Sequence, residues 1–279
     1  MPTSLILDTQ NFLHRSRAGF NLGSHAVVYN FFRSFRALLQ QHTPNRVYCA
    51  LEGYPKSRRE LYSEYKANRF IEPGSAKHEE MVNFHGQCAL VHDLLTRHFP
   101  VSVMRHPEWE CDDVIYNVVA RSSRAIDFVI VSNDSDFVQV TQEFENVRVW
   151  NPMKKSFMEA PEYSHIVWKV LRGDGSDNIP GVPGVSDRVA QELASDDIEL
   201  RKFLSENSER SDLFFRNWNL IKLHQWGEED ALKMTSSTPT RDWDSVKSTF
   251  DSWNFSSITK EPAWSKFVST FDPLFGGMK

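Results

Sequence analysis

The chain has 279 residues, 40% of them hydrophobic and 25% charged, which is ordinary for a globular protein with one large domain or one domain plus a small appendage. No run approaches ~18 consecutive apolar residues, and residues 1–20 lack the basic-then-apolar pattern of a secretory signal, so we expect neither a membrane span nor secretion. The net charge of −5 argues against a nucleic-acid-binding protein, unless clustered carboxylates hold divalent cations that reverse the local field.

Hydrophobic periodicity predicts short strands that alternate with helices. The predicted strands are 3–8, 46–52, 101–104, 127–134 and 146–150, the predicted helices are 27–41, 56–69, 77–98 and 110–122, and the pattern is helical from about 160 onward. This alternation predicts an α/β fold with a mostly parallel central sheet flanked by helices. We expect an α/β domain at 1–160, a second region at 161–223 and a small helical appendage at 224–279.

Acidic residues form five groups, several of them at the ends of predicted strands. The groups are Asp8; Glu52; Glu110 with Asp112 and Asp113; Asp134 with Asp136; and Asp174 with Asp177. Each group alone has an ordinary explanation as a helix cap or a turn. The carboxyl ends of parallel strands meet at one edge of a sheet, so we expect the groups to converge there. Crowded carboxylates repel one another unless cations are bound, and two divalent ions held ~4 Å apart suit phosphodiester cleavage.

A basic segment, RRELYSEYKANR (58–69), separates its charges if it forms one helix. One arc then carries Arg58, Tyr62, Tyr65, Lys66 and Arg69, and Glu60 and Glu64 point the other way. Such a face suits a phosphate backbone and an unstacked base, and a cation on it can stabilise charge on a transferring phosphoryl group. The alternative is a solvated helix face with internal ion pairs.

The stretch IPGVPGV, within residues 173–194, predicts a tight turn between two helices. Gly181 and Gly184 permit close backbone approach or a positive φ. The second helix begins around Ser186 and Arg188, and its free N–H groups make an anion site. The segment could therefore hold phosphates, or it could be an ordinary corner between helices.

Taken together, these segments resemble the 5′-nuclease family, which comprises bacterial and bacteriophage 5′–3′ exonucleases and eukaryotic flap endonucleases. The matching segments are LILDTQNFLHR (5–15), ALEGYPKSRRELYSEYKANR (50–69), EWECDDVI (108–115), IVSNDSDFVQV (130–140), GDGSDNIPGVPGVSDRVAQEL (173–193) and FFRNWNLIKL (214–223). The resemblance covers about residues 3–223. It implies a PIN-like 5′-nuclease fold with a helical arch at about 56–80 and a helix–three-turn–helix DNA-binding region.

The resemblance also implies roles for individual residues. The implied metal ligands are Asp8, Glu110, Asp112, Asp113, Asp134, Asp136, Asp174 and Asp177, together with Glu52, which stands where aspartate is commonest in the family. The implied catalytic residues are Lys66, Arg69, Asp134 and Asp136, and Arg58 and Tyr65 would contact DNA beside Lys66 and Arg69. Gly181, Val182, Gly184, Ser186 and Arg188 would hold duplex DNA, with Ser186 in place of a usual glycine, and backbone carbonyls there could bind K⁺.

The function implied is a monomeric nuclease with two Mg²⁺ ions, for which Mn²⁺ can substitute. It would act on 5′ ends and 5′ flaps of DNA or RNA–DNA hybrids, as in primer removal during replication, and its size is typical of stand-alone bacteriophage enzymes. Candidate protein partners are a single-strand-binding protein and a sliding clamp. The alternatives are a single-strand ribonuclease of related fold and a non-catalytic module that binds duplex DNA.

Two further features concern the cellular compartment and the chain end. The widely spaced Cys49, Cys88 and Cys111 form no CxxC pair and indicate reduced thiols, so we expect a cytoplasmic protein, or one in the host cytoplasm if it is viral. The C-terminal segment FVSTFDPLFGGMK (267–279) has large apolar residues. They predict either an anchor that packs on the core or an aromatic peptide that docks on a replication partner.

Overall fold

A seven-stranded sheet forms the centre of the protein, which we describe from a computed structural model for residues 3–20 and 23–276. Its strands are β1 Thr3–Asp8, β2 Arg46–Leu51, β3 Ser102–Arg105, β4 Asp127–Val131, β5 Val147–Asn151, β6 Ser156–Phe157 and β9 Thr235–Ser236. The spatial order is β6-β5-β4-β1-β2-β3-β9, and only the edge strands β6 and β9 run antiparallel to their neighbours. The predicted α/β fold with a mostly parallel sheet is therefore confirmed.

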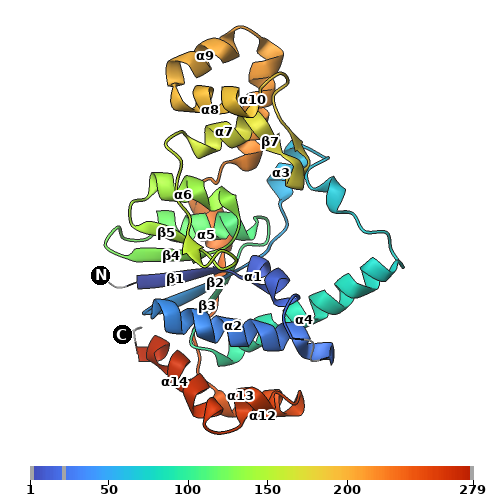
Figure 1. Ribbon diagram of the computed structural model, residues 1–279, viewed down its shortest axis with the longest axis vertical. Coiled ribbons are helices and arrows are strands. Elements are labelled where there is room, and N and C mark those ends of the chain that lie inside the picture. The colour runs from blue at the N-terminus through green and yellow to red at the C-terminus, as the bar shows by residue number, and fades with distance from the viewer. Residues whose placement is uncertain (1–2, 21–22, 277–279) are drawn as a thin grey trace.

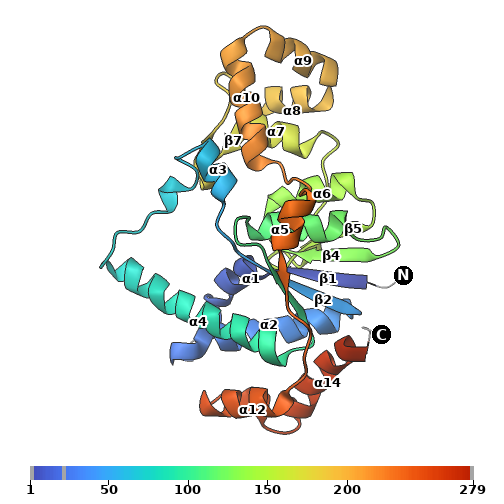
Figure 2. The same ribbon diagram turned by 180° about the vertical axis from the view of Figure 1, so that it is seen from behind.

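Helices surround this sheet and extend beyond it at both ends of the molecule (Figures 1 and 2). The α-helices are α1 Thr9–Ser16, α2 Ala26–His42, α3 Lys56–Leu61, α4 Ala76–His98, α5 Cys111–Ala120, α6 Val138–Glu143, α7 His165–Arg172, α8 Asp187–Ser195, α9 Asp197–Ser205, α10 Ser208–Ile221, α11 Glu228–Lys233, α12 Trp243–Ser252, α13 Ser256–Thr259 and α14 Ala263–Gly276. Short 3-10 turns are η1 Gly23–His25, η2 Ala67–Arg69, η3 Ser135–Phe137 and η4 Gly175–Asp177, and β7 Gly173–Asp174 pairs with β8 Ile179–Pro180. None of the helices in the described ranges combines the length and apolar character needed to cross a bilayer.

Alternating side chains of β1 divide the core between the two faces of the sheet. Leu5 and Leu7 join the cluster formed with α1, α2 and α4, whereas Ile6 joins the cluster formed with α5 and α6. All three side chains are fully buried. A strand buried on both faces is apolar throughout, which is why TSLILD reads as a continuous hydrophobic run that ends in an acid.

Helices α7–α10 form a separate lobe above the sheet (Figure 1, top) with its own hydrophobic cluster. Val170, Leu171 and Leu193 lie in this cluster, and Tyr65 reaches into it from the segment between α3 and α4. The lobe places η4 and the hairpin that follows it opposite the carboxyl ends of the strands.

The predicted single helix at 56–69 is wrong, because α3 ends at Leu61. Tyr62 is extended (φ −147°, ψ 101°) and Lys66 lies in the left-handed region (φ 58°). The Lys66 amide donates a hydrogen bond to the Asp177 carbonyl (2.9 Å), and Tyr65 is buried in the helical lobe. These tertiary contacts outweigh the helix propensity of the segment, so the one-sided basic arc does not form.

The C-terminal helices α12–α14 pack against the main core cluster rather than standing apart from it. Phe267 and Phe271 are fully buried and Leu274 is nearly so, against rings that include Phe99 and Trp243. Phe267, Phe271 and Leu274 therefore act as an anchor, and of the three rings in residues 267–275 only Phe275 is exposed. Residues 277–279 of the predicted segment lie outside the described residues.

Replacing Phe271 with Ala should lower the free energy of unfolding by about 3–5 kcal/mol, because it leaves a cavity among packed rings. Urea denaturation measures this loss. Phe275→Ala is the matched control, because Phe275 is 42% exposed, and its cost should stay below about 1 kcal/mol. Equal costs for the two variants would show that this helix end does not anchor in the core.

Candidate active site

Seven of the predicted acidic side chains line one cavity of about 220 Å³ at the carboxyl edge of the sheet. They are Asp8, Glu52, Asp112, Asp134, Asp136, Asp174 and Asp177. Asp8 ends β1, Glu52 follows β2, and Asp134 and Asp136 follow β4. Asp174 and Asp177 approach from η4 in the helical lobe. The cavity thus lies between the central sheet and the lobe formed by α7–α10.

Local hydrogen bonds fix several of these carboxylates. Asp8 caps α1 by accepting a hydrogen bond from the Asn11 amide (3.0 Å) and accepts another from the Ser132 hydroxyl (2.7 Å). Asp134 caps η3 through the Asp136 amide (2.9 Å). The capping and cluster interpretations of these acids are therefore compatible, because the caps hold the side chains in position.

Part of the cluster carries more negative charge than its surroundings neutralise. Burial and the nearby Asp134 carboxylate raise the pKa of Asp8 to about 6. Burial, Asp134 and Asp8 raise the pKa of Asp112 well above its usual value. Loss of water around its carboxyl group and the charge of Glu110 raise the pKa of Glu52 to about 7, although the residue as a whole is exposed. These carboxyl groups lack a cationic partner strong enough to offset burial and mutual repulsion.

Lys169 neutralises the other part of the cluster. Its ammonium group contacts Asp136 and lies 2.9 Å from Asp174, and the lysine is only 8% exposed. Although burial opposes the shift, Lys169 lowers the pKa of Asp174 to about 2. Lys169 is not among the predicted site residues. The available signal was a lysine inside the apolar run HIVWKVLR, five residues before Asp174.

The donor set fits hard divalent cations, which prefer carboxylate oxygens. Asp8, Asp112 and Asp134 are the acids whose mutual repulsion such a cation would relieve. The side chains do not form a closed cage: in residues 3–20 and 23–276, no three His, Cys, Asp or Glu residues are arranged to hold a metal ion. Asp136 and Asp174 form ion pairs with Lys169 in this structure, and their carboxylates do not converge with the other acids on one metal position.

Arg58 and Asp113 form a buried ion pair outside the cavity. The Arg58 guanidinium donates to Glu110 Oε2 (2.7 Å), to Asp113 Oδ1 (2.8 Å) and to the Leu220 carbonyl (2.8 Å). Asp113 is fully buried and does not line the cavity, and its role as a metal ligand stays a prediction. Arg58 is 5% exposed, so it cannot lie on a DNA-contacting surface.

Tyr65 and Glu110 belong to the same buried network. The Tyr65 hydroxyl donates to Glu110 (2.7 Å) and to Asp177 (3.1 Å), and the 2% exposure of Tyr65 contradicts its predicted DNA contact. Glu110 is contacted by Arg58, Tyr65 and Lys66 and does not line the cavity, and its role as a metal ligand stays a prediction. Despite burial, Lys66 and Arg58 keep its pKa below the usual range.

Lys66 and Arg69 line the cavity beside the acids, and their catalytic role stays a prediction. Lys66 contacts Glu110 and lies 3.6 Å from Asp177, and Arg69 pairs with the other oxygen of Asp177 (2.5 Å). Gln10, Asn11 and His14 of α1 line the same cavity and were not predicted. Their spacing along the helix that Asp8 caps was the signal that could have identified them.

The hairpin after η4 has the tight geometry expected of it. A Cβ on Gly181 would lie 2.4 Å from the Arg172 carbonyl oxygen, and Gly184 has φ +79°, so both positions favour glycine. Ser186 caps α8 by accepting from the Val189 amide (3.3 Å). Val182 is buried, whereas Ser186 and the Arg188 side chain, which pairs with Glu192, are exposed. A DNA-binding role for this hairpin stays a prediction.

The fold and cavity define a class: an α/β protein with carboxylates suited to divalent cations where its parallel strands end. Comparison with known proteins agrees with this class. Residues 3–167 match the family described as the 5′-3′ exonuclease, N-terminal resolvase-like domain. The protein belongs to this family.

Curated relatives include DNA polymerase I of Mycobacterium leprae, 28% identical over 201 residues, which cover 66% of this chain and 20% of the polymerase. A 5′-3′ exonuclease of Aquifex aeolicus is 27% identical over 215 residues, or 68% of each chain. The chain thus spans about a fifth of the length of the polymerases that it matches.

Solved structures establish the same fold. The T5 D15 protein co-crystallised with metal ions has a TM-score of 0.66 at 15% identity, covering 99% of this chain and all of that one. A bacteriophage T5 D15 flap endonuclease in a pseudo-enzyme–product complex with DNA and metal ions has a TM-score of 0.66 at 16% identity, with the same coverage.

The pH dependence of stability should reveal the unneutralised acids. The pKa values of Asp8 and Asp112 are raised in the folded protein, to about 6 for Asp8. Their favourable contribution to the free energy of unfolding is therefore complete below the pKa values of the unfolded chain, near ~4, and is lost as pH rises through the pKa values of the folded protein. Mg²⁺ should therefore raise the melting temperature more at pH 7.5 than at pH 5. Each kcal/mol that Mg²⁺ adds to the free energy of unfolding should raise the melting temperature by about 2–4 °C.

Asp112→Asn tests the cause of this effect. It should raise the melting temperature of the metal-free protein at pH 7.5, leave it nearly unchanged near pH 4, and reduce the Mg²⁺ increment. An Mg²⁺ increment of equal size at both pH values would contradict the assignment of these carboxyl groups as metal ligands.

Proposed function

We propose that the protein is a divalent-metal-dependent 5′ nuclease that hydrolyses phosphodiester bonds at 5′ ends and 5′ flaps of duplex DNA or RNA–DNA hybrids. The observation that carries this proposal is the convergence of seven carboxylates on one cavity that Lys66 and Arg69 also line. Two Mg²⁺ ions, or Mn²⁺ in their place, would supply an activated water and neutralise the leaving oxygen. The family membership of residues 3–167 and the names of the relatives support the same activity.

The protein's own residues would position the substrate. Lys66 and Arg69 hold positive charge beside Asp177, at the edge where a phosphate would meet the acids. Asp177 lies four residues before Gly181, so a duplex held by the hairpin would be placed directly at the cavity. Exposed Ser186 and Arg188 are suited to phosphates, and the hairpin carbonyls are the proposed site for K⁺.

The biological setting that fits this activity is primer or flap removal during replication, in the cytoplasm, by a monomer. Neither alternative function explains the structure as well. A single-strand ribonuclease would have no use for a duplex-holding hairpin, and a non-catalytic module would not need to keep seven carboxylates together when Asp8, Glu52 and Asp112 repel their neighbours.

Asp134→Asn should reduce cleavage of a 5′-labelled flap duplex in Mg²⁺ by about 10³-fold or more, because it removes a charge that the metal needs. EDTA should abolish wild-type cleavage, and the wild-type products should carry a 5′-phosphate. Asp212→Asn, at an exposed position on α10, makes the same chemical change away from the cavity and should cleave normally. Near-normal cleavage by Asp134→Asn would refute the metal-site assignment.

Lys66→Ala should slow the single-turnover cleavage rate by about 10²–10³-fold while changing the DNA dissociation constant only a few-fold. Lys66 stabilises charge on the phosphoryl group in this account, and such charge develops mainly in the transition state. Lys56→Ala on α3 is the control, because Lys56 pairs with Glu108 outside the cavity. An affinity loss with an unchanged rate would make Lys66 a backbone contact instead.

A further inference from the structure

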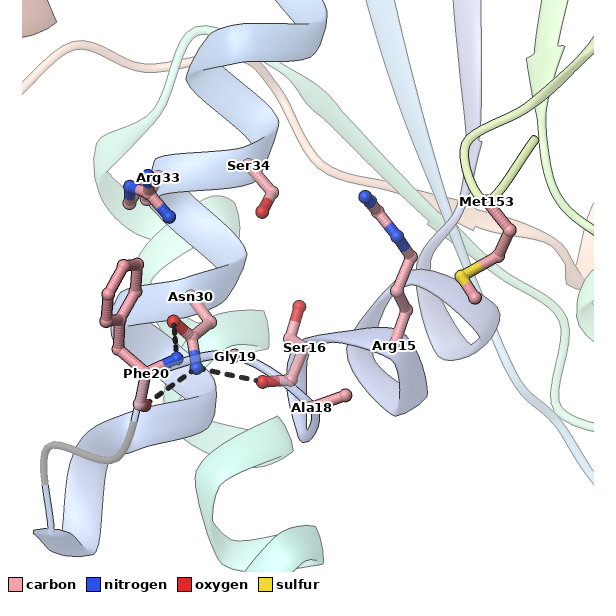
Figure 3. Close-up of a pocket in the computed structure, with 9 residues that line it drawn as sticks. All are labelled: Arg15, Ser16, Ala18, Gly19, Phe20, Asn30, Arg33, Ser34 and Met153. Atoms are coloured by element: carbon pink, nitrogen blue, oxygen red, sulfur yellow. Dashed lines mark hydrogen bonds between the residues drawn. The ribbon is translucent and has the colours of Figure 1, made fainter. Parts of the chain in front are cut away.

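A second cavity, of about 410 Å³, lies between the end of α1, the loop that follows it and α2 (Figure 3). Arg15 and Ser16 of α1, Arg33 and Ser34 of α2, and the loop residue Phe20 line it. None of the described residues that line it is acidic, although the whole protein carries a net charge of −5. The cavity is therefore an electropositive site on an acidic protein, which suits an anionic ligand.

The loop that carries Phe20 is held firmly. Asn30, which is 4% exposed, accepts a hydrogen bond from the Phe20 amide (3.0 Å) and donates to the carbonyls of Ser16 (3.1 Å) and Phe20 (3.0 Å) (Figure 3). A Cβ on Gly19 would lie 2.2 Å from Asn30 Cγ, so the loop closes tightly on this amide. The amide network orders the site before any ligand arrives, which lowers the entropic cost of binding.

Two large apolar side chains stay exposed at this ordered site. Phe20 is 57% exposed although the Arg33 guanidinium lies 4.7 Å from its ring centre, and Met153 is 64% exposed. An aromatic ring beside guanidinium groups binds nucleobases by stacking while the cations bind the phosphates. The combination therefore suits a nucleotide chain better than it suits a simple anion.

The site continues as a groove. A neighbouring cavity of about 280 Å³ shares Arg15 and Ser34 and is also lined by Lys155 and Gln41, again with no acid among its described residues. A single nucleotide would not need two adjoining cavities with three cations, so the occupant is a strand. We call the surface formed by Arg15, Phe20, Arg33 and Lys155 the α1–α2 groove.

Helix α1 links the groove to the acidic cavity. Asp8 caps its first turn inside the acidic cavity, and Arg15 and Ser16 end it in the groove. Eight helical residues span ~12 Å. A strand that leaves the acidic cavity can therefore reach the groove within a few nucleotides.

We propose that the α1–α2 groove binds the single-stranded 5′ arm of the nucleic-acid substrate. Arg15, Arg33 and Lys155 contact its phosphates, and a base stacks on Phe20. This inference rests on the proposed nuclease function. In it the hairpin holds the duplex, and the single-stranded arm lies on the opposite side of the acidic cavity.

Binding measured in EDTA, where no cleavage occurs, tests the proposal. Fluorescence anisotropy would compare a blunt duplex with duplexes that carry a 5′ arm of 3, 6 or 12 nucleotides, and with one that carries a 3′ arm. Wild-type affinity should rise with 5′-arm length. Arg33→Glu should remove most of this gain, about 10-fold for the longest arm, leave blunt-duplex binding unchanged, and reduce the salt slope for the armed duplex by about 0.7 per lost phosphate contact.

Lys266→Glu is the matched control, because it makes the same charge change at an exposed position on α14. Phe20→Ala should weaken 5′-armed binding and Phe20→Trp should restore it, with melting temperatures close to wild type. The proposal is overturned if Arg33→Glu behaves like Lys266→Glu on every arm, if it weakens blunt and armed duplexes equally, or if only the 3′ arm is affected. Failure of the nuclease proposal would appear separately, as wild-type protein that does not cleave in Mg²⁺.

Discussion

The repulsion among carboxylates at the carboxyl edge of the sheet is the constraint on which this structure depends. Parallel strands place Asp8 and Asp134 beside one another, and α5 adds Asp112. Burial and mutual charge raise the pKa of Asp8 and Asp112, and the charge of Lys66 offsets only part of the rise at Asp112. Such an arrangement costs stability in the metal-free protein. A divalent cation bound by the same carboxylate oxygens would remove this repulsion and so restore the lost stability.

A second ionic network keeps the structural acids apart from the cavity. Arg58 binds Glu110 and Asp113 and reaches the Leu220 carbonyl, so it ties α3 to α5 and to the end of α10. Removing one partner of such a buried pair leaves an uncompensated charge, which is strongly destabilising. The network also fixes where Lys66 enters the cavity, since Lys66 contacts Glu110 directly. In the Glu-x-Asp-Asp sequence, Asp112 thus lines the cavity, whereas Glu110 and Asp113 pair with Arg58.

The sequence predicts features that depend on local periodicity and on the geometry of parallel sheets. The five parallel strands, and the convergence of the strand-end acids Asp8, Asp134 and Asp136, belong to this kind. The sequence could not predict pairings decided by tertiary contacts. The sequence RRELYSEYKANR is compatible with one helix. The burial of Tyr65 and the backbone hydrogen bond from the Lys66 amide to the Asp177 carbonyl end the helix early. Lys169 was missed because its partners, Asp136 and Asp174, are brought to it only by the folded chain.

Anomalous scattering from Mn²⁺ in crystals of the wild-type protein tests most directly the claim that the acidic cavity is a divalent-metal site. Mn²⁺ takes oxygen ligands as Mg²⁺ does and can be located without relying on activity. The account predicts an anomalous peak within coordination distance of Asp8, Asp112 and Asp134, and its loss in Asp112→Asn crystals under the same conditions. Saturating Mn²⁺ that leaves no peak in this cavity, or a peak only at Glu110 and Asp113, would contradict it.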